Sequence, residues 1–225
     1  MALTEITTHL WRAEQPLKFS GAEVGARMVV VRLQGDRLLL HSPIRPTAEV
    51  RAEVDALGKV SYLVAPNSYH HLFVRPWAEA YPAAETFVAP GLPKKRPDLR
   101  HQGVLSDAPG PWAPELEHRL WRGAPMMQEV DFFHPASRTL IVTDLVHNFV
   151  EDRPLSTRIF FGLMGGWRGL RTTLLDKIVN RDRRAAKESL ERVLAWDFDR
   201  IVMAHGEVLE SGGRAELARA YAWLG

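Results

Sequence analysis

Three short apolar segments of this sequence each run directly into a polar loop. They span residues 60–65, 139–143 and 200–204. Segments of this length, rich in Val, Leu and Ile, are typical of buried strands. Because α/β proteins place ligand sites where strands end in loops, the three segments predict a sheet edge at which several loops meet.

The loops after these three segments carry side chains that can bind a metal or move a proton. His70 and His71 follow the first segment, Asp144 and His147 follow the second, and His205 follows the third. Hydrolytic metal sites need imidazoles and carboxylates from several loops, with one coordination position left open for water. Each loop alone is commonplace, but three in one chain together indicate a site.

The other expected elements favour a mixed α/β architecture. Strands are predicted at residues 28–33, 37–41, 86–89, 119–121 and 129–133. Helices are predicted at residues 48–57, 72–81, 183–196 and 214–224. Two β-rich halves with helices outside them suggest a four-layer α/β/β/α sandwich, although the pattern alone leaves a three-layer α/β fold open. We expect a single domain over 1–225, with a helical or irregular segment at about 150–180 that covers the site or an interface.

Composition excludes several function classes. At 225 residues the chain is long enough to bury a substantial core. Its net charge is +2, and no stripe of basic residues interleaved with aromatics occurs, so no nucleic-acid partner is expected. The absence of cysteine excludes disulfides, thiolate zinc sites and a cysteine nucleophile.

The sequence also bears on location. Residues 1–10 lack a positive stretch followed by an apolar one, and no run of about 18 apolar residues occurs. We therefore expect neither a signal peptide nor a membrane span. Together with the missing cysteines, this fits a cytoplasmic protein.

Short motifs spread over nearly the full chain carry a family resemblance. They include His41-Ser42-Pro43, Val64-Ala65-Pro66-Asn67, Pro90-Gly91-Leu92, Thr143-Asp144-Leu145 and Ala204-His205-Gly206. In its order of elements the chain resembles the metallo-β-lactamase superfamily, and in these motifs it is similar to a bacterial family of unknown function within that fold. The resemblance implies the α/β/β/α sandwich.

The first metal motif of that superfamily, Thr-His-x-His-x-Asp-His, is degenerate here. With Ala65 at the threonine, Pro66 and Ser68 stand at the first two histidines. His70 and His71 then take the places of the aspartate and the last histidine.

A second register, with Asn67 and Tyr69 at the first two histidines, loses those ligands as well. The segment expected to carry a third-motif histidine, 123–125, contains none. Asp144 matches the bridging aspartate and His205 the last histidine. The resemblance therefore implies a lost first metal site and a partly preserved second one.

From this resemblance we expect His70, His71, Asp144 and His205 as metal ligands, with Asp144 and Glu129 in catalytic roles. The cofactor would be one divalent ion, either zinc, iron or manganese. The leading hypothesis is a metal-dependent hydrolase of a small-molecule ester, lactone, amide or phosphoester. One alternative is a non-catalytic binding or scaffold protein without metal, and another is a metal-free enzyme with a His–carboxylate pair. A homodimer is also considered.

Overall fold

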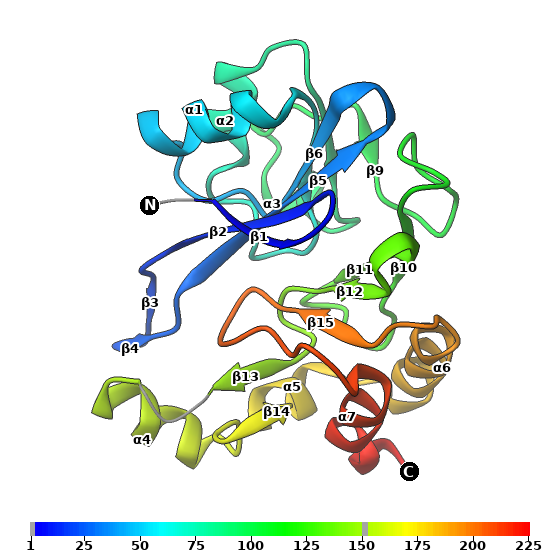
Figure 1. The fold of residues 1–225 in the computed structure, drawn as a ribbon. Coiled ribbons are helices and arrows are strands. Elements are labelled where there is room, and N and C mark those ends of the chain that lie inside the picture. Colours follow the sequence, from blue (N-terminus) through cyan, green and yellow to red (C-terminus); the bar gives the residue numbers. More distant parts are fainter. Residues whose placement is uncertain (1–2, 150–152) are drawn as a thin grey trace.

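The computed structural model describes residues 3–149 and 153–225 and contains two β-sheets packed face to face (Figure 1). Helices cover the outer side of each sheet. This is the four-layer α/β/β/α arrangement, so the expected fold class is confirmed. No helix in the described part of the chain is long and apolar enough to cross a membrane.

The first sheet has seven strands in the order β1-β2-β5-β6-β7-β8-β9. Its strands are β1 (Thr4–Thr7), β2 (Leu10–Gln15), β5 (Ala26–Leu33), β6 (Arg37–His41), β7 (Lys59–Ala65), β8 (Glu85–Val88) and β9 (Gly103–Val104). Pairing is antiparallel from β1 to β6 and parallel from β6 to β9. The parallel connections carry α1 (Ala48–Leu57) and α2 (Val74–Ala80), and α1 begins where the Thr47 side chain accepts from Val50 N.

The second sheet has four strands in the order β10-β11-β12-β15. They are β10 (Glu117–Leu120), β11 (Val130–His134), β12 (Thr139–Ile141) and β15 (Arg200–Val202). Pairing between β12 and β15 is parallel, so both strands end at the same edge. Helices α6 (Arg183–Leu194) and α7 (Gly213–Ala220) supply apolar side chains to the core on the outer face.

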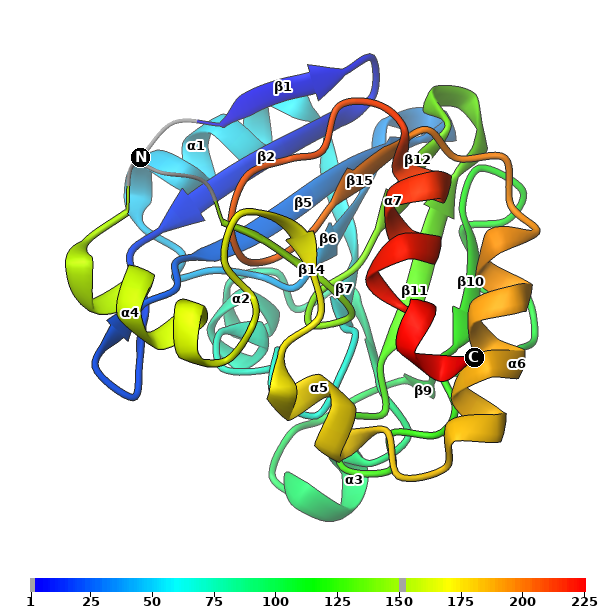
Figure 2. The same cartoon turned by 90° about the horizontal axis from the view of Figure 1, so that it is seen from below.

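Shorter elements complete the chain. They are hairpin β3 (Lys18–Phe19) and β4 (Ala22–Glu23), ribbon β13 (His147–Phe149) and β14 (Gly169–Arg171), helices α3 (Leu92–Lys95), α4 (Leu155–Leu163) and α5 (Leu174–Val179), and 3-10 turns η1 (Gln34–Asp36), η2 (Pro135–Ser137) and η3 (Ala222–Leu224). Seen from below, α4, β14, α5 and α7 lie on the face nearest the viewer, with α4 at the left and α7 to the right (Figure 2).

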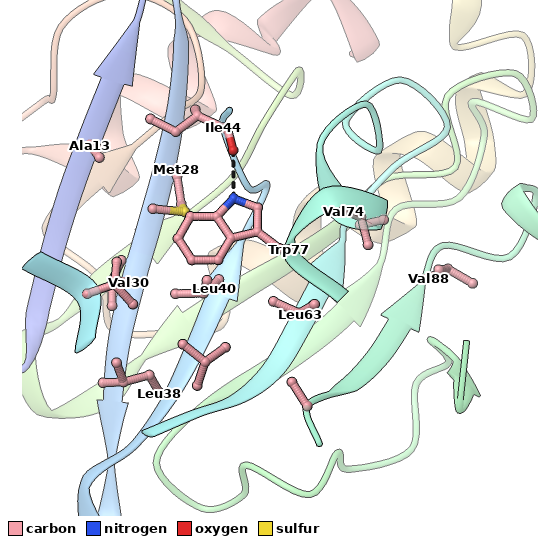
Figure 3. Close-up of a cluster of buried hydrophobic side chains, with 14 of the residues drawn as sticks. Ala13, Met28, Val30, Leu38, Leu40, Ile44, Leu63, Val74, Trp77 and Val88 are labelled. Carbon is pink, nitrogen blue, oxygen red and sulfur yellow. Dashed lines mark hydrogen bonds between the residues drawn. The ribbon is translucent and has the colours of Figure 1, made fainter. Parts of the chain in front are cut away.

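Successive side chains along a strand point to opposite faces of the sheet and so enter two different cores. On β6, Leu39 joins the core between the sheets, whereas Leu38 and Leu40 join the core under the helices. Trp77 of α2 is fully buried in that outer core and donates from Nε1 to Ile44 O at 2.7 Å (Figure 3). The indole thus fills space between helix and sheet without leaving its N–H unpaired.

The sequence predicted some elements well and missed others. The β6 strand and α1 have the expected bounds, and α6 and β7 differ only at their ends. Strands β1 to β4 and β13 to β14 were not predicted. In β2 the buried residues are Leu10, Ala13 and Gln15, which do not follow the strict alternation by which a half-buried strand is predicted. Helix α2 begins at Val74 rather than residue 72 because the histidine loop continues as turns to that point.

His41, at the end of β6, gives the core a dependence on pH. Its ring is buried against Phe132, with centroids 5.1 Å apart, and Nε2 has no partner among the described residues. Burial, followed by repulsion from His70, lowers the pKa of His41 to about 3. The unfolded state therefore binds this proton more readily than the folded state below pH 6.5.

Stability should consequently fall as the pH drops, and His41→Gln should remove this part of the loss. Between pH 7 and pH 5 the free energy of unfolding of the unaltered chain should decrease by about 2 kcal/mol more than that of the variant. Urea denaturation of both proteins at both pH values measures the difference. Parallel pH dependences would contradict the neutral, buried state of His41.

Candidate metal centre

One group of three side chains in the described chain has the geometry of a metal site. His70 follows β7, Asp144 follows β12, and His205 follows β15, so the ends of both sheets contribute. One ligand atom from each residue lies within 4.8 Å of the other two. The structure thus brings together three of the four residues expected to bind metal.

The Asp144 carboxylate lies between the two imidazoles. Its Oδ1 atom is 3.4 Å from His70 Nε2 and 3.3 Å from His205 Nε2. The two rings are 5.2 Å apart between centroids. All three side chains are largely buried, and Asp144 retains 19% exposure.

The partner of His205 identifies which of its nitrogens faces the centre with a lone pair. His205 Nδ1 lies 2.8 Å from Gly25 O, and a carbonyl oxygen can only accept. Nδ1 therefore carries the hydrogen, and in the neutral ring Nε2 presents its lone pair to Asp144 Oδ1. Two acceptors facing each other at this distance require a cation between them, either a proton or a metal ion. The donor set therefore fits a divalent metal.

His70 is oriented in a similar way. Its Nδ1 atom lies 2.7 Å from Ser42 Oγ, at the end of β6, which leaves Nε2 directed at Asp144. Burial alone would lower the pKa of His70, but the charge and hydrogen bond of Asp144 raise it. Burial alone would raise the pKa of Asp144, but His70 and His205 hold it well below its usual value. The carboxylate is therefore ionised.

Asn67 connects the histidine loop to the aspartate loop. Its Oδ1 atom accepts from the backbone N–H groups of Tyr69 and His70, both at 2.8 Å. Its Nδ2 atom lies 2.7 Å from Asp144 Oδ2 and 2.9 Å from Thr143 Oγ1. Asn67 thereby leaves Oδ1 as the Asp144 oxygen that faces the imidazoles.

Glu129 lies behind the centre rather than in it. The fully buried carboxylate accepts from Thr143 N at 2.6 Å and from Asp144 N at 2.9 Å, and Asn67 Nδ2 lies 3.3 Å away. Burial and then the charge of Asp144 raise its pKa to about 6. Glu129, expected from the sequence to be catalytic, thus contacts the backbone of the Asp144 loop and is not one of the three grouped side chains.

His71, the fourth residue expected to bind metal, is not among the three side chains that the structure brings together. Its Nδ1 atom lies 3.0 Å from Arg96 Nη1, and because a guanidinium only donates, this nitrogen accepts. Burial, followed by Arg96, lowers the pKa of His71 to about 4. Asn67 turns the backbone at His70, so that the two neighbouring rings have different partners.

The His205 loop is fixed by two features that sequence reasoning did not find. Gly206 has φ +90°, and a Cβ atom there would meet Asn148 O at 2.1 Å, so only glycine fits. Arg27 is buried and donates to Met203 O and Gly206 O. A buried arginine opposite backbone carbonyls leaves no pattern in a single sequence.

His147 is buried next to the group of His70, Asp144 and His205. Its ring is 5.9 Å from that of His205, and Nε2 lies 3.5 Å from Asp176 Oδ2. Nδ1 has no hydrogen-bond partner in the described part of the chain. The ring is buried, with Phe149 and Phe161 beside it.

Replacing Asn67 should remove the contacts that connect the loop of His70 to the loop of Asp144. Asn67→Ala removes the contacts to three side chains and two backbone N–H groups and should lower the free energy of unfolding by about 2–3 kcal/mol. Ser68→Ala is the matched control, because Ser68 N donates to Met127 O and Ser68 O accepts from Lys95 Nζ, and these backbone bonds should survive. Chemical denaturation of both variants measures the effect, and equal stabilities would contradict the linking role of Asn67.

Comparison with solved structures agrees with the fold described above. A metallo-β-lactamase from Pontibacter korlensis superposes with TM-score 0.68 at 14% identity, covering 99% of this chain and 98% of that one. One from Erythrobacter litoralis gives TM-score 0.69 at 14% identity over 99% and 95%. FIM-1 from Pseudomonas aeruginosa, in its mono-zinc form, gives 0.66 at 13% over 99% and 93%.

No curated protein sequence matches the chain. At the sequence level, the family described as "Domain of unknown function (DUF4336)" matches residues 7–160, which is more than half of the chain. The structural likenesses extend over nearly its whole length. The chain therefore has the metallo-β-lactamase fold and belongs to the DUF4336 family.

Proposed function

We propose that this protein is a metal-dependent hydrolase with one divalent ion held by His70, Asp144 and His205. The observation that carries the proposal is the convergence of His205 Nε2 and His70 Nε2 on Asp144 Oδ1, at 3.3 and 3.4 Å. The hydrogen bond from His205 Nδ1 to Gly25 O supports it, because metal-bound histidines commonly donate from their other nitrogen.

Two imidazoles and one carboxylate suit zinc first, with iron and manganese as alternatives. Three protein ligands would leave a position open for water, whose pKa a bound metal lowers toward neutrality. One of the solved neighbours is described as a mono-zinc form, which supports a single ion as a sufficient occupant of this fold.

A second ion is not part of the proposal. Pro66 and Ser68 stand where the superfamily has its first two histidines, and both are buried. Within the described residues, only His70, Asp144 and His205 bring three possible ligand atoms close enough together to hold a metal ion. The proposed centre therefore uses the positions of the superfamily's second site.

The residues around Asp144 hold its carboxylate in position and leave one of its oxygens available for chemistry. Asn67 and the backbone contacts to Glu129 hold the Asp144 loop, and Asn67 engages Oδ2. Asp144 Oδ1 is then the oxygen that can orient a water molecule or accept its proton. Substrates consistent with such chemistry are esters, lactones, amides and phosphoesters.

The lost first-site histidines favour a second candidate, a non-catalytic domain that binds a ligand without turning it over. Metal content alone does not separate the two, because a binding domain can also retain an ion. Turnover of a substrate panel separates them.

Metal binding should depend on Asp144 and His205 and not on His71, the residue after His70. After loading with zinc and removal of excess ion, elemental analysis should find about one zinc per chain. Asp144→Ala and His205→Ala should lose most of it, because each removes a ligand. His71→Ala is the control and should retain it, since that ring contacts Arg96. Retention by Asp144→Ala, or loss by His71→Ala, would overturn the ligand assignment.

Hydrolysis should depend on the same carboxylate. The zinc-, iron- and manganese-loaded protein should hydrolyse at least one chromogenic ester, lactone, amide or phosphoester, and Asp144→Asn should reduce turnover by about 100-fold or more. Lys59→Ala, an exposed change at the far end of β7, should leave turnover intact. A loaded protein inactive on every class would favour the binding domain.

A further inference from the structure

Exposed aliphatic side chains are concentrated on two helices outside the centre. Eleven large apolar side chains of the described residues are exposed, and six of them lie between residues 155 and 178. Their exposed fractions range from 42 to 82%. These six are Leu155, Ile159, Leu163, Leu174, Leu175 and Ile178. Exposed apolar side chains gathered in this way usually mark an interaction surface.

The six side chains come from adjoining elements. On α4, Leu155, Ile159 and Leu163 are spaced four residues apart and therefore share one stripe. Helix α5 starts against the end of α4, where Leu174 N donates to Met164 O at 2.8 Å. Figure 2 shows both helices on the same side of the molecule. We call the exposed side of these two helices the α4–α5 face.

The other side of α4 anchors this face to the fold. Phe161 is buried against Phe149, with ring centroids 3.9 Å apart, and its ring lies 5.9 Å from that of His147. Thr157 is fully buried, and its hydroxyl accepts from Glu23 N at 3.0 Å. Helix α4 therefore has a separate buried face, and the exposed aliphatic stripe is not needed to attach the helix to the core.

The segment that carries the α4–α5 face is rich in basic residues. Residues 153–184 contain eight Arg or Lys and two Asp, and one of these, Asp176, is buried. Glu151 and Asp152 come directly before this range. With both counted, residues 150–184 hold eight basic and four acidic side chains, a net charge of +4 against +2 for the whole chain. The remainder of the protein is therefore slightly acidic.

The basic side chains accompany the aliphatic ones. Arg158 on α4, Arg171 at the end of β14 and Lys177 on α5 are all exposed. An exposed aliphatic stripe with basic side chains beside it suits an anionic lipid surface, where the apolar groups enter the interface and the cations meet the head groups. A second copy of the same face would instead bring like charges together.

We propose that the α4–α5 face docks this protein on the surface of an anionic phospholipid bilayer. The contact is peripheral, since no helix of the described chain is long enough to span. It needs no metal, so it stands or falls independently of the proposed hydrolase. Its expected signature is a joint dependence on the aliphatic side chains, the basic side chains and the salt concentration.

Co-sedimentation with lipid vesicles tests the proposal. The full chain should sediment with vesicles of phosphatidylcholine and phosphatidylserine in a 3:1 ratio and much less with phosphatidylcholine alone. Binding should weaken at 0.5 M salt. The double variant Ile159→Asn with Leu163→Asn, and the double variant Arg158→Gln with Lys177→Gln, should each reduce the bound fraction by about tenfold.

Val104→Asn is the matched control, because it removes an exposed apolar side chain from β9, outside the α4–α5 face, and should bind as the unaltered chain does. Circular dichroism and zinc content should be unchanged in all variants, which excludes unfolding as the cause of lost binding. The proposal is overturned if the folded chain does not sediment with the anionic vesicles, or if the aliphatic variant binds as well as the control. A dimer in light scattering that the aliphatic variant dissociates, without vesicle binding, would identify the face as a self-association surface instead.

Discussion

The site depends on the contacts that the ionised carboxylate of Asp144 makes with the imidazoles of His70 and His205. A buried negative charge is costly unless partners surround it, and Asp144 has two imidazoles on one oxygen and Asn67 on the other. The two sheets meet around it, since His70 follows a strand of the first sheet and His205 follows a strand of the second. Without an ionised Asp144, the two rings would have no common partner.

The support behind this carboxylate explains why a degenerate motif still yields an ordered site. Glu129 accepts backbone bonds from Thr143 and Asp144, and Asn67 links the same loop to His70. These contacts do not require a metal in place. The loss of the first-site histidines therefore removes ligands without removing the framework that orients the remaining ones.

Much of the fold could be predicted from the sequence, because hydrophobic periodicity and turn residues report on local structure. The β6 strand and α1 have bounds that their residues indicate directly. The strands that were missed, such as β13, are short and gain their stability from neighbours distant in sequence. Periodicity carries no record of such contacts.

The candidate site was predictable only in part for a similar reason. Strand ends pointed to Asp144 and His205, but the choice between His70 and His71 depends on the turn that Asn67 makes and on Arg96. Arg27 and Glu129 owe their roles to backbone groups far along the chain. A pattern of residue types does not show which backbone group a side chain meets.

The proposed function requires one metal ion between His70, Asp144 and His205. The most direct measurement is an anomalous difference map from a crystal of the zinc-loaded protein, collected on both sides of the zinc absorption edge. We expect one strong peak within coordination distance of His70 Nε2, Asp144 Oδ1 and His205 Nε2, about 2.0–2.2 Å from each. A peak beside His71 instead, or no peak at this centre in zinc-loaded crystals, would contradict it.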